Sequence, residues 1–254
     1  MKHHFHASAP ANKSGAYTLV EILIAMSLTT LVMTMALGVF TTSLRAMYRD
    51  MQRLATDASL RSFTSQVAKK TLDSTEFYVF SDHRKLDGSV DLAADVSALD
   101  PDGGVFQAFG DCLVLVTRIS TAGTANVRQF RIYYRATTGT SHNIDAQAPI
   151  RYFESSDYGA SGTSTSLTAL LNAVNLNADA NLTGSKQMVQ NSRGRLRTPA
   201  PTTGPVCYPI FSTESATTTP TNESVSINVE IINGTTANNL LSSSSFHYTI
   251  SPRR

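Results

Sequence analysis

The sequence predicts an α+β protein in which one long N-terminal helix precedes a β-rich domain. Three observations support this class: an uncharged apolar run over 22–44, helical spacing of apolar residues to about residue 70, and alternating spacing beyond about residue 75. A helix segregated from a run of strands is typical of α+β folds. We therefore expect the helix to pack on a C-terminal antiparallel β-sheet domain with long loops.

The apolar run is long enough to cross a membrane. It holds 23 residues without a charge, from Ile22 to Leu44, and a helix of that length spans about 34 Å against a hydrocarbon core of about 30 Å. A cleaved secretory signal has a shorter apolar stretch and a small-residue cleavage site after it, which is missing here. The sequence therefore predicts a retained transmembrane helix, with a short cytoplasmic leader and a long domain outside.

The helix is predicted to continue beyond the membrane as an amphipathic helix. No proline occurs between Pro10 and Pro101, and apolar residues follow helical spacing at Leu44, Met47, Met51, Leu54 and Ala58, then at Leu60, Phe63 and Val67. We expect this distal part to pack on the downstream domain; a coiled-coil stalk is the alternative. The predicted parts are a leader (1–16), a long helix (17–70) and an extracytoplasmic β-rich globular domain (71–254).

The C-terminal part alternates apolar and polar residues as half-buried strands do. The strand candidates are 112–116, 127–135, 150–153, 225–231 and 246–250, of which the last two could pair as a hairpin. Leu167–Val174 is predicted as a short helix. Stretches rich in Ser, Thr, Asn, Gly and Pro are predicted to be surface loops: 135–149, 155–166, 176–206 and 212–224.

The residues that introduce the apolar run have a specific order. Lys13 is followed by small residues, an aromatic residue, the tetrapeptide Thr-Leu-Val-Glu and the long apolar stretch. This segment resembles the leader and N-terminal helix of type IV pilins and pseudopilins. Because that family carries Glu as the fifth mature residue, the resemblance implies leader cleavage between Ala16 and Tyr17. The family usually has Gly before the cut, and Ala16 departs from that pattern.

Glu21 is the acidic residue at the edge of the apolar run. Cleavage would free an α-amine at Tyr17, largely protonated at neutral pH and one helical turn from Glu21. Amine and carboxylate could neutralise each other within one subunit or between neighbours, and a buried pair can fix register. The resemblance implies that assembly role for Glu21 and N-methylation of Tyr17. The alternative is that Glu21 only marks the helix start, where a carboxylate complements the helix dipole.

Cys112 and Cys207 are the two cysteines of the chain. Because an exported domain lies in an oxidising compartment, we predict a disulfide between them. The alternative is two unpaired buried thiols, since sequence spacing does not show that the two residues meet.

The sequence carries no motif of an enzyme or a cofactor site. It has no G-x-S-x-G, H-E-x-x-H, C-x-x-C, G-x-G-x-x-G or Walker pattern. An acidic turn at Asp100–Gly104 lacks the Glu that completes an EF-hand loop. The net charge of +2 and the absence of aromatic residues around Arg193–Arg197 argue against nucleic acid as a partner. We therefore expect no enzyme, no cofactor and no metal.

The resemblance of the N-terminal segment implies a minor pilin or pseudopilin, a structural subunit that assembles through its N-terminal helix into a type IV pilus or a type II secretion pseudopilus. The resemblance implies other pilin or pseudopilin subunits, the prepilin peptidase and the inner membrane as partners. It places the subunit in the inner membrane, then in a periplasmic or cell-surface filament. The alternative is a single-pass membrane-anchored extracytoplasmic binding domain that does not polymerise.

Overall fold

The computed structural model of the chain describes residues 17–90, 92, 107–121, 124–137, 147–176, 184–194, 209–214, 224–233 and 242–250. The chain divides into two compact units, Met1–Tyr48 and Arg49–Arg254. The described part of the first unit is the beginning of helix α1 (Leu19–Leu72), and the remainder of α1 belongs to the second unit. The long helix followed by antiparallel strands confirms the predicted α+β class.

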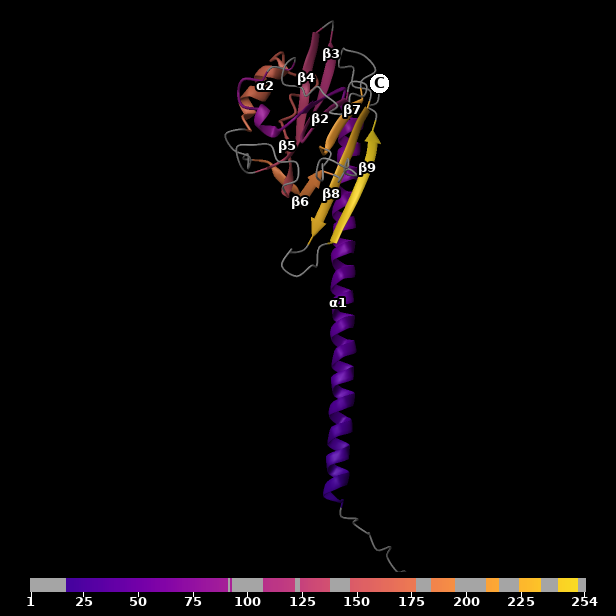
Figure 1. Cartoon of the computed structure of the whole chain (residues 1–254). Helices are drawn as coiled ribbons and strands as arrows, with labels where there is room; N and C mark the ends of the chain where they lie inside the picture. Colours follow the sequence, from indigo (N-terminus) through magenta and orange to yellow (C-terminus); the bar gives the residue numbers. More distant parts are fainter. Residues whose placement is uncertain are drawn as a thin grey trace, which may run out of the picture. The chain divides into compact units, whose positions relative to one another are not determined.

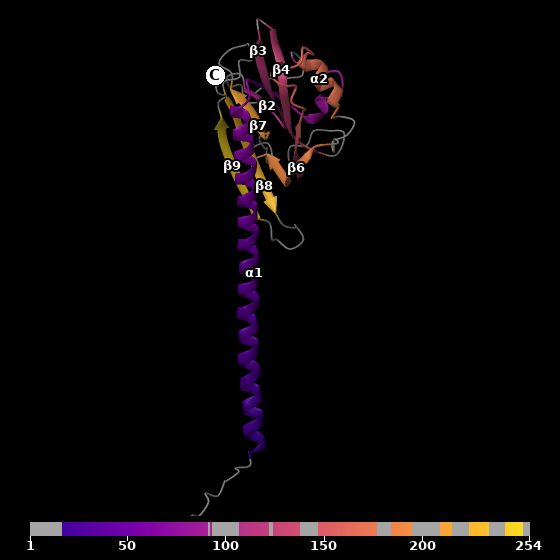
Figure 2. The same ribbon diagram turned by 180° about the vertical axis from the view of Figure 1, so that it is seen from behind.

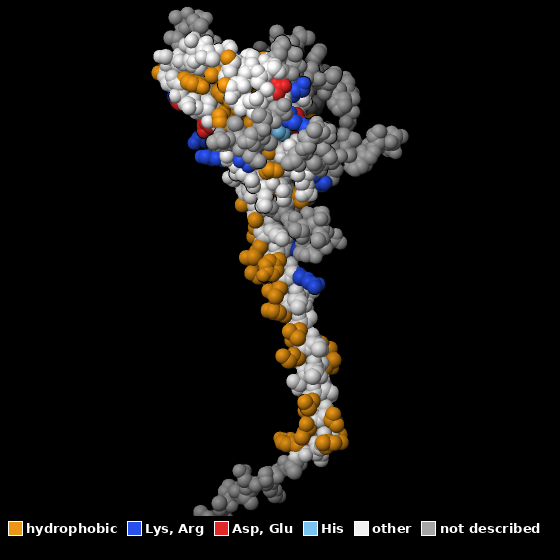
Figure 3. All heavy atoms as spheres, turned by 90° about the vertical axis from the view of Figure 1, so that its left-hand side faces the viewer, with side chains coloured by type: hydrophobic (Ala, Val, Ile, Leu, Met, Phe, Trp, Pro, Cys, Tyr) orange, Lys and Arg blue, Asp and Glu red, His pale blue; other side chains and the backbone are white. Residues whose placement is uncertain are grey.

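The described part of the first unit, 17–48, is an apolar helical segment whose side chains are all exposed in the isolated chain. By length and composition α1 is the one helix of the described residues that could cross a membrane. Hydrophobic side chains follow its exposed length, as Figure 3 shows in orange. Ser and Thr hydroxyls along it donate to backbone carbonyls three or four residues earlier, as Thr34 does to Leu31 at 2.8 Å. Such bonds let hydroxyl groups enter an apolar medium, because no donor is left unpaired.

The second unit contains one antiparallel sheet, which has nine strands among the described residues (Figure 1). The strands are β1 (Glu76–Phe80), β2 (Gln107–Gly110), β3 (Cys112–Thr121), β4 (Thr124–Arg135), β5 (Ala148–Glu154), β6 (Lys186–Gly194), β7 (Phe211–Glu214), β8 (Ser224–Asn233) and β9 (Ser242–Ile250). Their order is β1-β3-β4-β5-β6-β8-β7-β2, with β9 added to β8. All pairs are antiparallel, as predicted.

Strand β8 is the branch point of the sheet, because it pairs with β6, β7 and β9. It pairs with β9 from Val225 to Asn233, which confirms the predicted C-terminal hairpin, and the two strands lie side by side in Figures 1 and 2. Its other edge is shared between β7 and β6. The last strand of this order, β2, lies close to the first, β1. A Cβ on Gly110 of β2 would lie 1.8 Å from the carbonyl oxygen of Phe80 in β1. Only glycine therefore fits at this junction.

Both faces of the sheet are covered. On one face Leu60, Phe63 and Val67 of α1 pack in a core with alternate residues of the strands, including Leu113 and Leu115. The other face carries α2 (Leu167–Val174) and the segment around the 3-10 helix η1 (His83–Lys85), which pack on the intervening strand residues. Burial on both faces explains why β3 reads as a continuous apolar run.

Helix α2 occupies the predicted range, Leu167–Val174. The Ser166 hydroxyl caps its first turn by accepting a hydrogen bond from the Ala169 amide at 3.2 Å. Leu167 and Leu171 are its buried residues.

Two predicted loops are partly wrong. Strand β6 lies inside the predicted loop 176–206, and most of β7 lies inside the predicted loop 212–224. The polar sequence of β6 pairs with β5 and β8 and buries Val189 and Ser192. Tertiary pairing has outweighed local composition here, as strand propensity is strongly context-dependent.

The predicted packing stripe of the distal helix is correct only in its second part. Leu60, Phe63 and Val67 are buried, but Met47, Met51 and Leu54 are more than half exposed. Thr56, Thr64 and Thr71 are buried on α1 instead. Their hydroxyls donate to carbonyls four residues earlier, so these donors are satisfied within the helix although the residues are buried.

Cys112 has a free thiol and is fully buried at the start of β3. Burial, together with the nearby carboxylates of Asp82 and Asp111, raises the pKa of this thiol well above its usual range. Cys207 lies outside the described residues. The disulfide therefore stays a prediction.

Candidate functional site

The start of α1 is fixed by a reciprocal contact between Thr18 and Glu21. The Thr18 amide and the Thr18 hydroxyl each donate to Oε2 of Glu21 at 3.0 Å. In return the Glu21 amide donates to Oγ1 of Thr18 at 3.3 Å. This is a capping box, in which residues three apart satisfy donors that have no partner inside the helix. The sequence begins a helix here because threonine and glutamate stand at these two positions.

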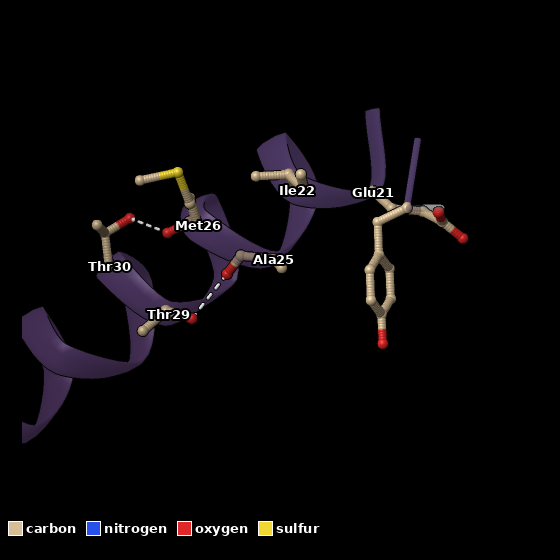
Figure 4. A pocket seen from close by; sticks show the side chains of 7 residues that line it. Glu21, Ile22, Ala25, Met26, Thr29 and Thr30 are labelled. Carbon is tan, nitrogen blue, oxygen red and sulfur yellow. Dashed lines mark hydrogen bonds between the residues drawn. The ribbon is translucent and has the colours of Figure 1, made fainter. Parts of the chain in front are cut away.

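A shallow groove runs along the first turns of α1. It is lined by residues one turn apart: Tyr17, Glu21, Ile22, Ala25, Met26, Thr29 and Thr30. Figure 4 shows that the carboxylate of Glu21 lies at one end of this row and Thr29 and Thr30 at the other. The groove therefore combines an apolar wall with one acidic end.

The two threonines of the groove add little polarity to it. Oγ1 of Thr29 donates to the Ala25 carbonyl at 2.7 Å, and Oγ1 of Thr30 donates to the Met26 carbonyl at 3.0 Å (Figure 4). Their donors are thus used within the helix. Glu21 is the charged residue among those that line the groove, so a cation is the chemical group that this end of the helix attracts.

The residues predicted for processing and assembly stand as follows. Tyr17 directly precedes the capping box and is 81% exposed. Ala16 lies outside the described residues. Tyr17 and Glu21 line the same groove, but the carboxylate is bonded to Thr18. In the uncut chain the Tyr17 nitrogen is part of a peptide bond and carries no charge, so the predicted pairing of amine and carboxylate remains a prediction. Cys112 belongs to the second unit.

Thr18 is the residue that sequence reasoning missed. The pattern Thr18-Leu19-Val20-Glu21 directly before an apolar helix is a sequence signature of a capping box. It could have been recognised from the order of residues alone. The prediction considered Glu21 only with the new chain terminus and with the helix dipole.

Buried charged and polar groups among the second unit's described residues are used in packing. No group of three or more His, Cys, Asp or Glu side chains that could hold a metal occurs in the described ranges. His83 is buried, with Nδ1 at 2.7 Å from Oδ1 of Asp82, and its ring lies against Tyr134. Asp111, which follows the acidic turn Asp100–Gly104 by seven positions in the sequence, is buried in an ion pair with Arg135. Both arrangements are those of a packed protein interior.

The N-terminal segment has a counterpart among known families. Residues 11–37 match the family model described as the prokaryotic N-terminal methylation motif. The match includes Tyr17, Thr18 and Glu21 and confirms the resemblance of this segment to the N-terminus of type IV pilin precursors. No curated protein and no solved structure matches the chain.

Proposed function

We propose that this chain is a minor pilin or pseudopilin, a structural subunit that enters a type IV pilus or a type II secretion pseudopilus through α1. The observation that supports this most directly is the methylation motif at 11–37, which leads into an exposed apolar helix long enough to cross a membrane. A motif and a helix of this kind serve a subunit whose N-terminus is first processed and then buried among other apolar helices.

The proposed sequence of events begins in the inner membrane. The prepilin peptidase cuts between Ala16 and Tyr17 and methylates the new amine of Tyr17. The carboxylate of Glu21 then meets such an amine, either its own or that of a neighbouring subunit. In an apolar bundle neither charge is tolerated alone, so their pairing favours one axial register between subunits.

The β-rich domain is proposed to be carried on the outer side of the membrane and later on the surface of the filament. Its two packed faces and buried ion pairs support a structural role rather than catalysis. Since most of the 254 residues lie beyond the helix, each copy would place a large mass on the filament. This size favours the role of a minor subunit over that of the major subunit that forms most of the filament.

The cut is tested on protein purified from cell membranes. Intact-mass and N-terminal peptide mass spectrometry should find a chain that starts at Tyr17 and carries one added methyl group. A host strain without prepilin peptidase should yield the chain with its leader. A chain that keeps residues 1–16 in the peptidase-positive host would contradict the proposal and favour the anchored binding domain that does not polymerise.

The assembly role is tested with Glu21→Gln. This variant should insert in the membrane and be cut as the wild type is, but should be strongly depleted from sheared filaments and from subunit cross-links. Asp57→Asn is the matched control, because Asp57 is an exposed acid on the same helix but lies in the second unit. Equal incorporation of Glu21→Gln and wild type would refute the role of Glu21.

A further inference from the structure

The contacts between Thr18 and Glu21 use only one side of the carboxylate. Both bonds from Thr18 end on Oε2. Among the described residues no hydrogen bond reaches Oε1. A carboxylate has lone pairs for about four hydrogen bonds. The side chain of Glu21 is thus held through one oxygen, while the other remains accessible to a donor from outside the helix.

We propose that Thr18 is a positioning residue for Glu21: it holds the carboxylate through Oε2 so that Oε1 is presented to the amine of a second copy of this chain. This inference rests on the proposed function, because it assigns a role to Thr18 only if Glu21 acts in assembly. Cleavage after Ala16 leaves both Thr18 donors in the mature chain, so the capping box survives processing.

The physical gain is preorganisation. A free glutamate side chain samples many rotamers, and a neighbour that binds it must restrict them. In this chain Thr18 has already restricted them, and its bonds do not compete with an ammonium group at Oε1. A subunit that lacks the Thr18 hydroxyl keeps the charge of Glu21 but loses one of the two bonds to Oε2, and with it the bond that the Glu21 amide donates to the hydroxyl.

The variants that isolate this role differ only in one hydroxyl. Thr18→Val has nearly the shape of threonine and lacks the hydroxyl, whereas Thr18→Ser keeps it. Thr34→Val is the matched control, since the Thr34 hydroxyl donates to the Leu31 carbonyl and Thr34 does not line the groove. Each substitution is made alone in the full chain. Thr18→Val is also combined with Glu21→Gln in a double variant.

Two measurements are made on each variant. The first is the yield of cross-links between copies in membranes, counted per cleaved subunit so that altered cleavage does not enter. The second is hydrogen exchange of the Glu21 amide in the full chain in detergent. That amide lies in the first turn, where no carbonyl of the helix can accept it, so its protection reports the bond to Thr18 directly.

We expect Thr18→Val to reduce cross-linking about five-fold and to accelerate exchange of the Glu21 amide by a similar factor, as loss of a helix cap does. Thr18→Ser should restore both values, and Thr34→Val should change neither. The double variant should cross-link no less than Glu21→Gln alone, because Thr18 acts through Glu21.

The outcomes separate the two proposals. If Glu21→Gln abolishes cross-linking while Thr18→Val does not alter it, Thr18 is not a positioning residue and the assembly role of Glu21 stands. If Glu21→Gln cross-links like the wild type, the assembly role itself fails. Unchanged exchange of the Glu21 amide in Thr18→Val, or a further loss of cross-linking in the double variant, would also overturn the inference.

Discussion

Asp111 and Arg135 form an ion pair that is closed to solvent. Their side chains are 1% and 0% exposed, and Nη2 of Arg135 lies 2.6 Å from Oδ2 of Asp111. Nε of Arg135 donates to the same oxygen at 2.8 Å, and Oδ1 of Asp111 accepts the Ile210 amide at 3.0 Å. The pair thereby joins the residue before β3, the end of β4 and the residue before β7.

Replacing one member of this pair should destabilise the second unit strongly. Asp111→Asn removes the charge that faces Nε and Nη2 of the buried Arg135 guanidinium, which lowers the free energy of unfolding by about 3–5 kcal/mol. Denaturant unfolding of the full chain in detergent measures this. Asp157→Asn is the control, because its pair with Arg128 is about half exposed, and it should shift the midpoint far less. Similar shifts in both variants would show that the buried pair has no special role.

The attachment of α1 to the sheet should depend on Phe63 and not on the apolar residues earlier in the helix. Phe63 is fully buried and meets the Tyr133 ring edge-on at a centroid distance of 6.3 Å. Phe63→Ala should therefore cost about 3–5 kcal/mol of unfolding free energy. Met51 is 54% exposed, so Met51→Ala should change stability by less than about 0.5 kcal/mol. Limited proteolysis within α1 gives an independent readout; a protected Phe63→Ala helix would contradict the expectation.

These contacts show which features the sequence could predict. The helix and the five predicted strands carry their own periodicity, so a local pattern was enough to find them. Arg135 stands on the polar side of an alternating strand and gives no local sign of burial, since its partner Asp111, which lies opposite it across the β3–β4 pair, comes 24 positions earlier in the chain. The polar strand β6 likewise becomes a strand through its neighbours. Thr18 differs from these residues, because the capping-box pattern that it forms with Glu21 is local and could have been predicted from the sequence.

The second unit should lose stability in acid as the carboxylate of Glu154 becomes protonated. Partial burial alone raises its pKa, but hydrogen bonds from Arg131 at 2.8 Å and Lys70 at 2.9 Å outweigh burial and hold the pKa at about 2, below the usual 4.5. Because the folded-state pKa is the lower one, this stabilisation is complete above pH 4.5 and is lost as the pH falls toward about 2.

Urea unfolding of the full chain between neutral pH and pH 2 measures this dependence. Glu154→Gln should flatten the decline over the acidic range. A residual slope should remain, because Asp157 and Asp87 also have lowered pKa values. Lys70→Met should move the decline to higher pH, since it removes one of the groups that lower the pKa of Glu154. An unchanged profile in Glu154→Gln would exclude this carboxylate as the cause.

The disulfide predicted between Cys112 and Cys207 is open to a chemical test, since the structure gives the Cys112 thiol as free and does not describe Cys207. The Ile210 amide is bonded to the side chain of the residue next to Cys112. Cys207 precedes Ile210 by three positions, and three residues span at most about 11 Å. A bond between the two cysteines would join positions that are 95 apart in the chain.

Protein isolated under oxidising conditions, with thiols blocked before unfolding, should yield a peptide pair that joins Cys112 to Cys207 in mass spectrometry. Closing a loop of this size contributes roughly 4–5 kcal/mol in the chain-entropy model. Reduction and the double variant Cys112→Ser/Cys207→Ser should therefore lower the unfolding midpoint to a similar degree. Because Cys112 is fully buried, Cys112→Ser also removes packing, and Cys207→Ser alone separates the two effects. Full alkylation of Cys207 in the native oxidised protein would show that the two thiols are unpaired.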